Sequence, residues 1–169
     1  MGPGAWLLPG RLAWRPMELE LGRVTDRRPP FKYSALARVG FSDTDAQGIV
    51  YYGRYMPYFD TAQREYQRHL GLLGSNVEPE RFVMRAVTVE YHAPARFDDL
   101  LEVFVRVRRI GRSSVTTAFA AHREGDGLLM CTAQQTAVLI DVAAGRPANV
   151  PEAYRAVVRS FEGHDLEEG

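Results

Sequence analysis

Residues 41–60 of the chain read FSDTDAQGIVYYGRYMPYFD, a short acidic loop that runs into a segment rich in tyrosine. Apolar side chains continue beyond it with spacings of one, three and four residues, at Tyr55, Tyr58, Phe59, Ala62, Tyr66, Leu70 and Leu73. This spacing is typical of one face of a helix. Because Pro57 is tolerated only in a first turn and Gly71 suits a C-terminal cap, we expect a long helix over residues 53–70.

Segments with the alternating pattern of β-strands surround this helix. One precedes it, at residues 33–42, where apolar side chains alternate with polar or small ones. Four more follow it, separated by Gly, Pro and Asp turns, at residues 81–93, 100–110, 113–123 and 128–140. Residues 151–161 have the spacing of a short closing helix. The sequence therefore predicts an α+β domain with the order β-α-β-β-β-β-α, whose strands wrap the aromatic helix.

Composition and charge limit the classes of partner and compartment. The 169 residues include 21 Lys+Arg and 21 Asp+Glu, so the chain has no general attraction to nucleic acid or anionic lipid. No apolar run approaches the roughly 18 residues of a membrane helix. Cys131 is the only cysteine, which excludes an intrachain disulfide and leaves a cysteine-based zinc site without ligands. We expect a cytoplasmic protein without nucleic-acid binding, membrane insertion, metal or cofactor.

The first 30 residues differ from the rest in their content of Gly and Pro and in the absence of a sustained apolar period. Their apolar run at Ala5–Leu8 is too short for the core of a signal peptide. We expect a disordered extension over residues 1–30, a folded domain over residues 31–162 and a C-terminal tail over residues 163–169.

The stretch from Phe41 to Asp60 resembles the signature of the 4-hydroxybenzoyl-CoA thioesterase family, especially of its YbgC-like acyl-CoA thioesterases. That signature is an aspartate, two residues, Gly-Ile/Val-Val-Tyr and a tyrosine-rich helix, and Asp45 and Gly48 occupy its first positions. A second matching segment, FVMRAVTVEYHAPARFDDL, covers residues 82–100. The resemblance implies a hot-dog fold, an antiparallel five-stranded sheet around a long central helix, and hydrolysis of an acyl-CoA thioester to free acid and CoA.

The resemblance also implies roles for individual residues. Asp45 corresponds to the aspartate that attacks the thioester carbonyl or directs water to it, and the backbone N–H of Tyr52 corresponds to the group that holds the carbonyl oxygen. The start of a helix favours a developing negative charge, which agrees with that role. Gly48 is expected to permit close approach of the backbone to the thioester. Without the resemblance, Asp45 reads as a residue that caps or turns the chain, and Asp43 is expected to support the loop.

Substrate contacts are expected from two regions. Tyr51 and Tyr55 are candidates for lining the pocket of a small or medium acyl group, aliphatic or aromatic, whereas Tyr58 and Phe59 belong to the core. Arg112, Ser113 and Ser114, at a turn into a strand, lie where the resembled family places basic and hydroxyl groups near the nucleotide phosphates of CoA.

Two other functions fit the same fold. A non-catalytic module that binds acyl thioesters is the alternative, with Asp45 in a structural role. A dehydratase requires a histidine opposite the central helix, and His92 is the residue in position for it. For all of these functions we expect a homodimer or homotetramer with sites at the subunit boundary, because a single wrapped sheet leaves its edges unpaired.

Overall fold

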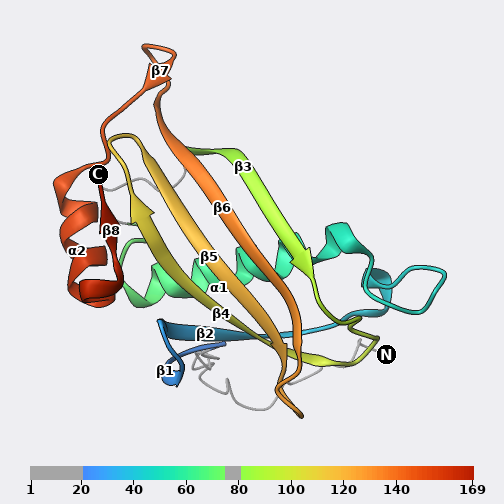
Figure 1. The fold of residues 1–169 in the computed structure, drawn as a ribbon. Coiled ribbons are helices and arrows are strands. Elements are labelled where there is room, and N and C mark those ends of the chain that lie inside the picture. The colour runs from blue at the N-terminus through green and yellow to red at the C-terminus, as the bar shows by residue number, and fades with distance from the viewer. Residues whose placement is uncertain (1–20, 75–80) are drawn as a thin grey trace, which may run out of the picture.

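The computed structural model describes residues 21–74 and 81–169, and Figure 1 shows one curved sheet with a long helix across its inner face. The helices are α1 (Tyr55–His69) and α2 (Glu152–Glu162), with a 3₁₀ turn at Tyr52–Arg54 directly before α1. The strands are β1 (Gly22–Arg28), β2 (Phe31–Arg38), β3 (Phe82–Tyr91), β4 (Leu100–Ile110), β5 (Ser114–Arg123), β6 (Leu129–Asp141), β7 (Arg146–Pro147) and β8 (Glu167–Glu168).

The main path of the sheet has the order β1-β2-β4-β5-β6-β3, and every neighbouring pair on this path is antiparallel. The helix α1 buries its aromatic face against the inner side, where Phe59 and Tyr66 are almost fully buried. The rings of Phe59 and Phe119 lie 5.0 Å apart, which joins the helix to β5. The predicted arrangement of an antiparallel sheet around one long helix is confirmed.

The predicted number of five strands is too low, because the described residues alone form a sheet of eight. The three additional strands are β1, β7 and β8, of which the last two have only two residues each. Such short strands pair through their backbones and present too few side chains for an alternating pattern.

The predicted disordered extension is wrong for its last part, because Gly22–Arg28 forms β1 and pairs with β2. Residues 1–20 lie outside the described residues. Sequence periodicity missed β1 because its side chains make polar contacts: Arg23 and Arg27 both form ion pairs with the Glu102 carboxylate on β4. This carboxylate is buried and also accepts a hydrogen bond from the Ser34 hydroxyl.

The predicted C-terminal tail is likewise part of the fold. Its strand β8 runs parallel to the end of β4, and Glu168 forms an ion pair with Arg159 on α2. The buried carboxylate of Glu162, at the end of α2, accepts hydrogen bonds from the Tyr66 hydroxyl (2.6 Å) and the Val107 N–H (3.0 Å). The chain end is thus held to both α1 and the sheet. Within the described residues, no helix has the length and apolar character needed to cross a bilayer.

Candidate active site

The loop between β2 and α1 holds Asp45 in a tight backbone arrangement. The Asp45 N–H donates to the Ile49 carbonyl (2.9 Å), and the Gly48 N–H donates to the Asp45 carbonyl (3.0 Å). Gly48 has a φ of +73°, a conformation that side chains other than glycine rarely adopt. The structure therefore gives Gly48 the geometry of a turn that returns the chain toward the start of α1.

The Asp45 carboxylate keeps one oxygen available. Its Oδ1 accepts a hydrogen bond from the Gln47 N–H (2.8 Å), which fixes the side chain in a local turn. Among the described residues, none donates to Oδ2. Since Asp45 is half-buried, this oxygen remains accessible to a ligand in the adjoining pocket.

The neighbouring carboxylate of Asp43 is fully engaged in structural contacts. It accepts hydrogen bonds from the Gly40 N–H (2.9 Å), the Tyr58 hydroxyl (2.7 Å) and the Arg54 guanidinium (2.6 and 2.9 Å). Burial by itself raises the pKa of this carboxyl, but the bonds from Tyr58 and Arg54 outweigh burial and hold the pKa below its ordinary value. Asp43 therefore stays ionised and fixes the loop to α1.

The first turn before α1 presents free backbone donors. The Arg54 N–H donates to the Tyr51 carbonyl (2.8 Å), which closes the 3₁₀ turn. In the described part of the chain, the N–H groups of Tyr52 and Gly53 have no acceptor. Unpaired N–H groups at the start of a helix attract negative charge.

An open pocket of about 340 Å³ brings the loop and the helix start together. Of the residues predicted for the site, Asp45, Tyr52 and Tyr55 line it. Its remaining lining comes from the loop and from the end of β3 with the residues that follow: Gln47, Ile49, Val50, Tyr91, His92, Ala93 and Pro94. The pocket thus brings together the Asp45 carboxylate, Tyr52 with its free N–H, and a wall of aromatic and aliphatic side chains.

Tyr91 is a pocket residue that sequence reasoning missed. Its hydroxyl donates to the Tyr52 carbonyl oxygen (2.9 Å), and its ring lies edge-on to Tyr55 with 5.7 Å between centroids. Burial raises the pKa of Tyr91 above its ordinary value and that of Tyr55 to about 12, so both hydroxyls are neutral at physiological pH. The only signal for Tyr91 in the sequence is its place in the segment of residues 82–100.

The other predicted substrate contacts lie outside this pocket. Tyr51 is partly exposed and packs on Tyr52, with 4.2 Å between ring centroids, but does not line the pocket. Arg112 and Ser113 occupy the turn between β4 and β5, and Ser114 begins β5.

That turn lies at the far end of the sheet from the pocket. Along β6, the partner of Ser114 is Val138 and the partner of Tyr91 is Cys131, seven positions away. This corresponds to about 23 Å of strand. One chain therefore does not bring Arg112, Ser113 and Ser114 beside Asp45.

Other reactive groups are placed unfavourably for chemistry. Cys131 is buried, and burial raises the pKa of its thiol to about 12, so the nucleophilic thiolate is scarce. The Nε2 atom of His92 lies 3.1 Å from the Thr132 hydroxyl at the pocket rim. No group of His, Cys, Asp and Glu suited to a metal ion occurs among residues 21–74 and 81–169.

Comparisons with known proteins agree on one family. The sequence profile of the thioesterase-like superfamily matches residues 39–158. The acyl-CoA thioester hydrolase YbgC of Escherichia coli is 35% identical over 128 residues, which cover 74% of this chain and 92% of that protein. The acyl-CoA thioesterase YbgC of Haemophilus influenzae is 29% identical over 127 residues, covering 73% and 92%. A Thermus thermophilus thioesterase solved with coenzyme A and zinc has a TM-score of 0.68 at 28% identity, covering 78% of this chain and 95% of its own.

Proposed function

The chain belongs to the thioesterase-like superfamily and is an acyl-CoA thioester hydrolase with a hot-dog fold, and we propose that Asp45 is its catalytic carboxylate. The observation that carries this proposal is that Asp45 and Tyr52 line one pocket, while the Asp45 Oδ2 atom and the Tyr52 N–H have no hydrogen-bond partner among the described residues. Hydrolysis of a thioester needs these two kinds of group, one to deliver the nucleophile and one to stabilise the oxyanion.

The reaction proceeds by one of two balanced routes. In the first, Asp45 attacks the thioester carbonyl, the carbon–sulfur bond breaks with release of the CoA thiolate, and water then hydrolyses the resulting anhydride. In the second, Asp45 takes a proton from water as the water attacks the carbonyl, and collapse of the tetrahedral intermediate expels the thiolate. The leaving thiol has a pKa of about 8.5 and needs little acid assistance. In both routes the Tyr52 N–H donates to the developing oxyanion.

The acyl group occupies the part of the pocket bounded by Tyr55, Tyr91 and Ile49. Gly48, which does not line the pocket, contributes the turn that lets the loop backbone approach the thioester. Tyr51 borders the pocket entrance through its contact with Tyr52. For the CoA phosphates we infer contacts from Arg112, Ser113 and Ser114 of a second subunit, because the same turn of the first subunit lies at the far end of the sheet.

The edge strand β3 supports this two-subunit arrangement. In the described part of the chain β3 pairs only with β6, so its other edge is open over ten residues. Several apolar side chains on it are exposed, among them Val83 (56%), Met84 (49%) and Val87 (43%). An open and apolar edge is a ready template for pairing with another strand. Since β3 ends at Tyr91, a partner paired there lies beside the pocket.

The experiment that tests the function is thiol release from a panel of acyl-CoA esters by the full chain, with identification of the free acid. We expect turnover of small and medium acyl groups, aliphatic or aromatic. Binding of the esters without release of CoA would contradict hydrolysis and favour the non-catalytic binding module.

A further inference from the structure

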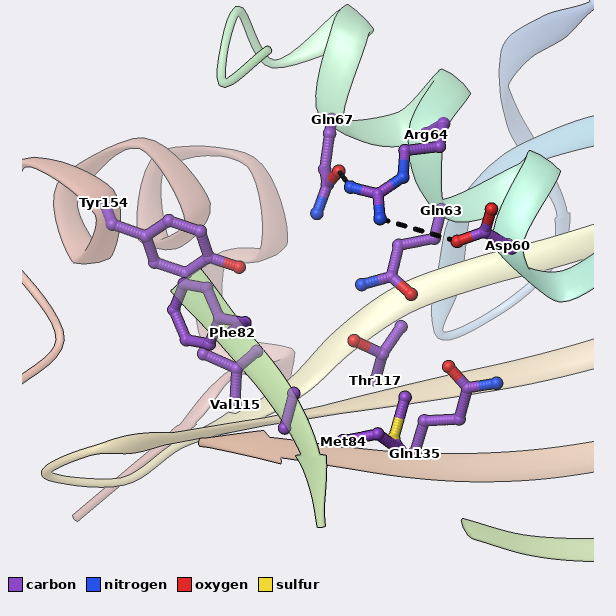
Figure 2. Close-up of a pocket in the computed structure, with 11 residues that line it drawn as sticks. Asp60, Gln63, Arg64, Gln67, Phe82, Met84, Val115, Thr117, Gln135 and Tyr154 are labelled. Atoms are coloured by element: carbon purple, nitrogen blue, oxygen red, sulfur yellow. Dashed lines mark hydrogen bonds and ion pairs between the residues drawn. The ribbon is translucent and has the colours of Figure 1, made fainter. Parts of the chain in front are cut away.

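A second cavity lies further along α1, beneath the inner side of β3 (Figure 2). Its volume is about 100 Å³, and α1, β3, β5, β6 and α2 all contribute to its wall. It shares no lining residue with the thioester pocket. Because one water occupies about 30 Å³ in the liquid, the cavity has room for a small chemical group and not for a complete cofactor.

Several polar side chains line this cavity, as Figure 2 shows. Thr117 on β5 and Tyr154 on α2 are each only 4% exposed, and neither hydroxyl has a hydrogen-bond partner among the described residues. The Gln63 side chain also has none there, and the Gln135 amide makes only a 3.8 Å contact with the Met56 sulfur. These side chains belong to buried residues or, for Gln63, to a half-buried one, where polar groups ordinarily have a hydrogen-bond partner in the protein or in water. These groups can all be satisfied by a ligand that both donates and accepts hydrogen bonds.

The charged residues at the cavity mouth are already neutralised. The Arg64 guanidinium lies 3.5 Å from the Asp60 carboxylate and donates to the Gln67 side-chain oxygen (2.9 Å). The opposite wall is apolar, formed in part by Phe82 and Met84 of β3. With no unpaired charge to offset the desolvation of an ion, the cavity favours a neutral polar group.

Two apolar side chains, Met56 of α1 and Val87 of β3, neighbour Gln135 of this cavity on the side of the thioester pocket. Val87 of β3 is paired directly opposite Gln135 of β6, and Gln135 contacts Met56 of α1. Directly opposite residues of an antiparallel pair share a face, so Val87 points to the same inner side as Met56. Tyr55, which lines the first pocket, and Gln63, which lines the second, are eight residues apart on α1. This separation corresponds to about 12 Å along the helix axis.

Resting on the proposed hydrolysis at Asp45, we propose that the cavity beneath β3 binds a neutral hydroxyl or amide group at the far end of a medium-length acyl chain. The thioester lies at Asp45, the chain passes between Met56 and Val87, and its terminal group hydrogen-bonds to Thr117, Gln135 and Gln63. Substrates of this class carry a polar group remote from the thioester, in contrast to plain fatty acyl groups.

The test compares kcat/KM for octanoyl-CoA and its ω-hydroxy derivative, with propionyl-CoA as a substrate too short to reach the cavity. We expect the wild-type chain to prefer the hydroxylated ester by at least about tenfold, because an unhydroxylated chain leaves the buried polar groups unpaired. The near-isosteric substitution Thr117→Val should remove most of this preference and leave propionyl-CoA hydrolysis unchanged.

The matched control is Thr116→Val, one residue earlier on β5. Thr116 does not line the cavity, and its hydroxyl lies 3.0 Å from the Thr136 hydroxyl on β6. This variant should retain the preference. Gln63→Leu, on the half-buried face of α1, provides a second cavity variant if Thr117→Val folds poorly.

The outcomes separate this inference from the proposed function. Hydrolysis of propionyl-CoA without a preference for the hydroxylated ester would overturn the inference and leave the function standing. A preference that survives both cavity variants would also overturn it. So would equal or better turnover of the ω-carboxy derivative of octanoyl-CoA, assayed beside the ω-hydroxy ester as a charged counterpart. Failure to hydrolyse any of the esters would remove the proposed function itself.

Discussion

The Tyr91 hydroxyl at the end of β3 donates a 2.9 Å hydrogen bond to the Tyr52 carbonyl, in the turn that begins α1. The Tyr52 carbonyl and the Gly53 N–H belong to the same planar peptide unit. A hydrogen bond to the carbonyl therefore fixes the orientation of that N–H and strengthens it as a donor. The end of one strand thus fixes the backbone turn that begins α1, next to the pocket proposed for the thioester.

Tyr91→Phe tests this positioning role. Loss of the hydroxyl should lower kcat for the best acyl-CoA by about tenfold, since it removes the hydrogen bond that holds the Tyr52 carbonyl, in the residue whose own N–H is proposed to hold the oxyanion. KM and the melting temperature should change little, because the aromatic ring remains. The pH profile should keep its shape, since a hydroxyl that stays neutral transfers no proton. An unchanged kcat, or a loss of melting temperature that accounts for the fall, would contradict the role.

Asp45→Asn is the direct test of the catalytic carboxylate. The amide is nearly isosteric and keeps an oxygen to accept the Gln47 N–H, but it loses the charge needed for attack or for proton transfer. We expect kcat to fall by at least about a hundredfold with little change in melting temperature. Thiol release under single-turnover conditions measures the chemical step. Wild-type turnover by this variant would remove Asp45 from the mechanism.

Asp43→Asn, unlike Asp45→Asn, should lower the stability of the fold. Because its bonds to Tyr58 and Arg54 hold the folded-state pKa of Asp43 below the unfolded value, its contribution to stability is present above the unfolded pKa of about 4. It is lost as the pH falls through the folded-state pKa. Melting curves of wild type and variant should therefore differ at pH 7, begin to approach each other near pH 4, and converge once the pH is below the folded-state pKa. A constant difference across this range would contradict the ionic role.

The sequence predicted the regular part of this fold because periodic burial leaves a readable pattern. The strand predicted at residues 100–110 agrees with β4, and the closing helix agrees with α2 within one residue. Strand β1 could not be predicted in this way, since Arg23 and Arg27 bind the buried Glu102 carboxylate and show no apolar alternation.

The candidate site likewise contains residues that the sequence predicts and residues that only the fold reveals. Asp45, Tyr52 and Tyr55 are close in sequence and belong to one motif, so their meeting in one pocket could be predicted. Tyr91 joins them through a bond that spans 39 residues, and no local pattern reveals which backbone group a hydroxyl at a strand end will reach. Thr117 and Tyr154 resemble ordinary core residues in sequence, and only the fold brings them to one cavity.

Truncation at the N-terminus separates the contribution of β1 from that of the preceding residues. Removal of residues 1–30 deletes β1 and leaves the buried Glu102 carboxylate without Arg23 and Arg27. An unpaired buried charge is strongly destabilising, so the melting temperature should fall by several degrees. Removal of residues 1–20 keeps both ion pairs and should therefore lower the melting temperature less than removal of residues 1–30 does. Equal melting temperatures for the two truncations would show that β1 contributes nothing to stability.

The open edge of β3 leads to a prediction about assembly. Val83 on β3 and Val24 on β1 are exposed to nearly the same degree, 56% and 58%, and lie on the two outer strands of the main sheet path. If β3 pairs with a second copy, Val83→Lys places two positive charges at that junction and should shift the protein toward monomer. Val24→Lys makes the same chemical change at the other edge and should leave the assembly intact.

Light scattering at micromolar concentration, together with the rate of thiol release, tests whether the edge of β3 holds two subunits together. We expect the wild-type chain to form at least a dimer, and Val83→Lys to lose activity in proportion to its dissociation, because the CoA contacts inferred from Arg112, Ser113 and Ser114 come from the second subunit. Dilution should reduce the activity of Val83→Lys more than that of Val24→Lys, since association depends on concentration. A fully active monomer of 19.0 kDa would rule out the shared site and return the phosphate contacts to residues of a single chain.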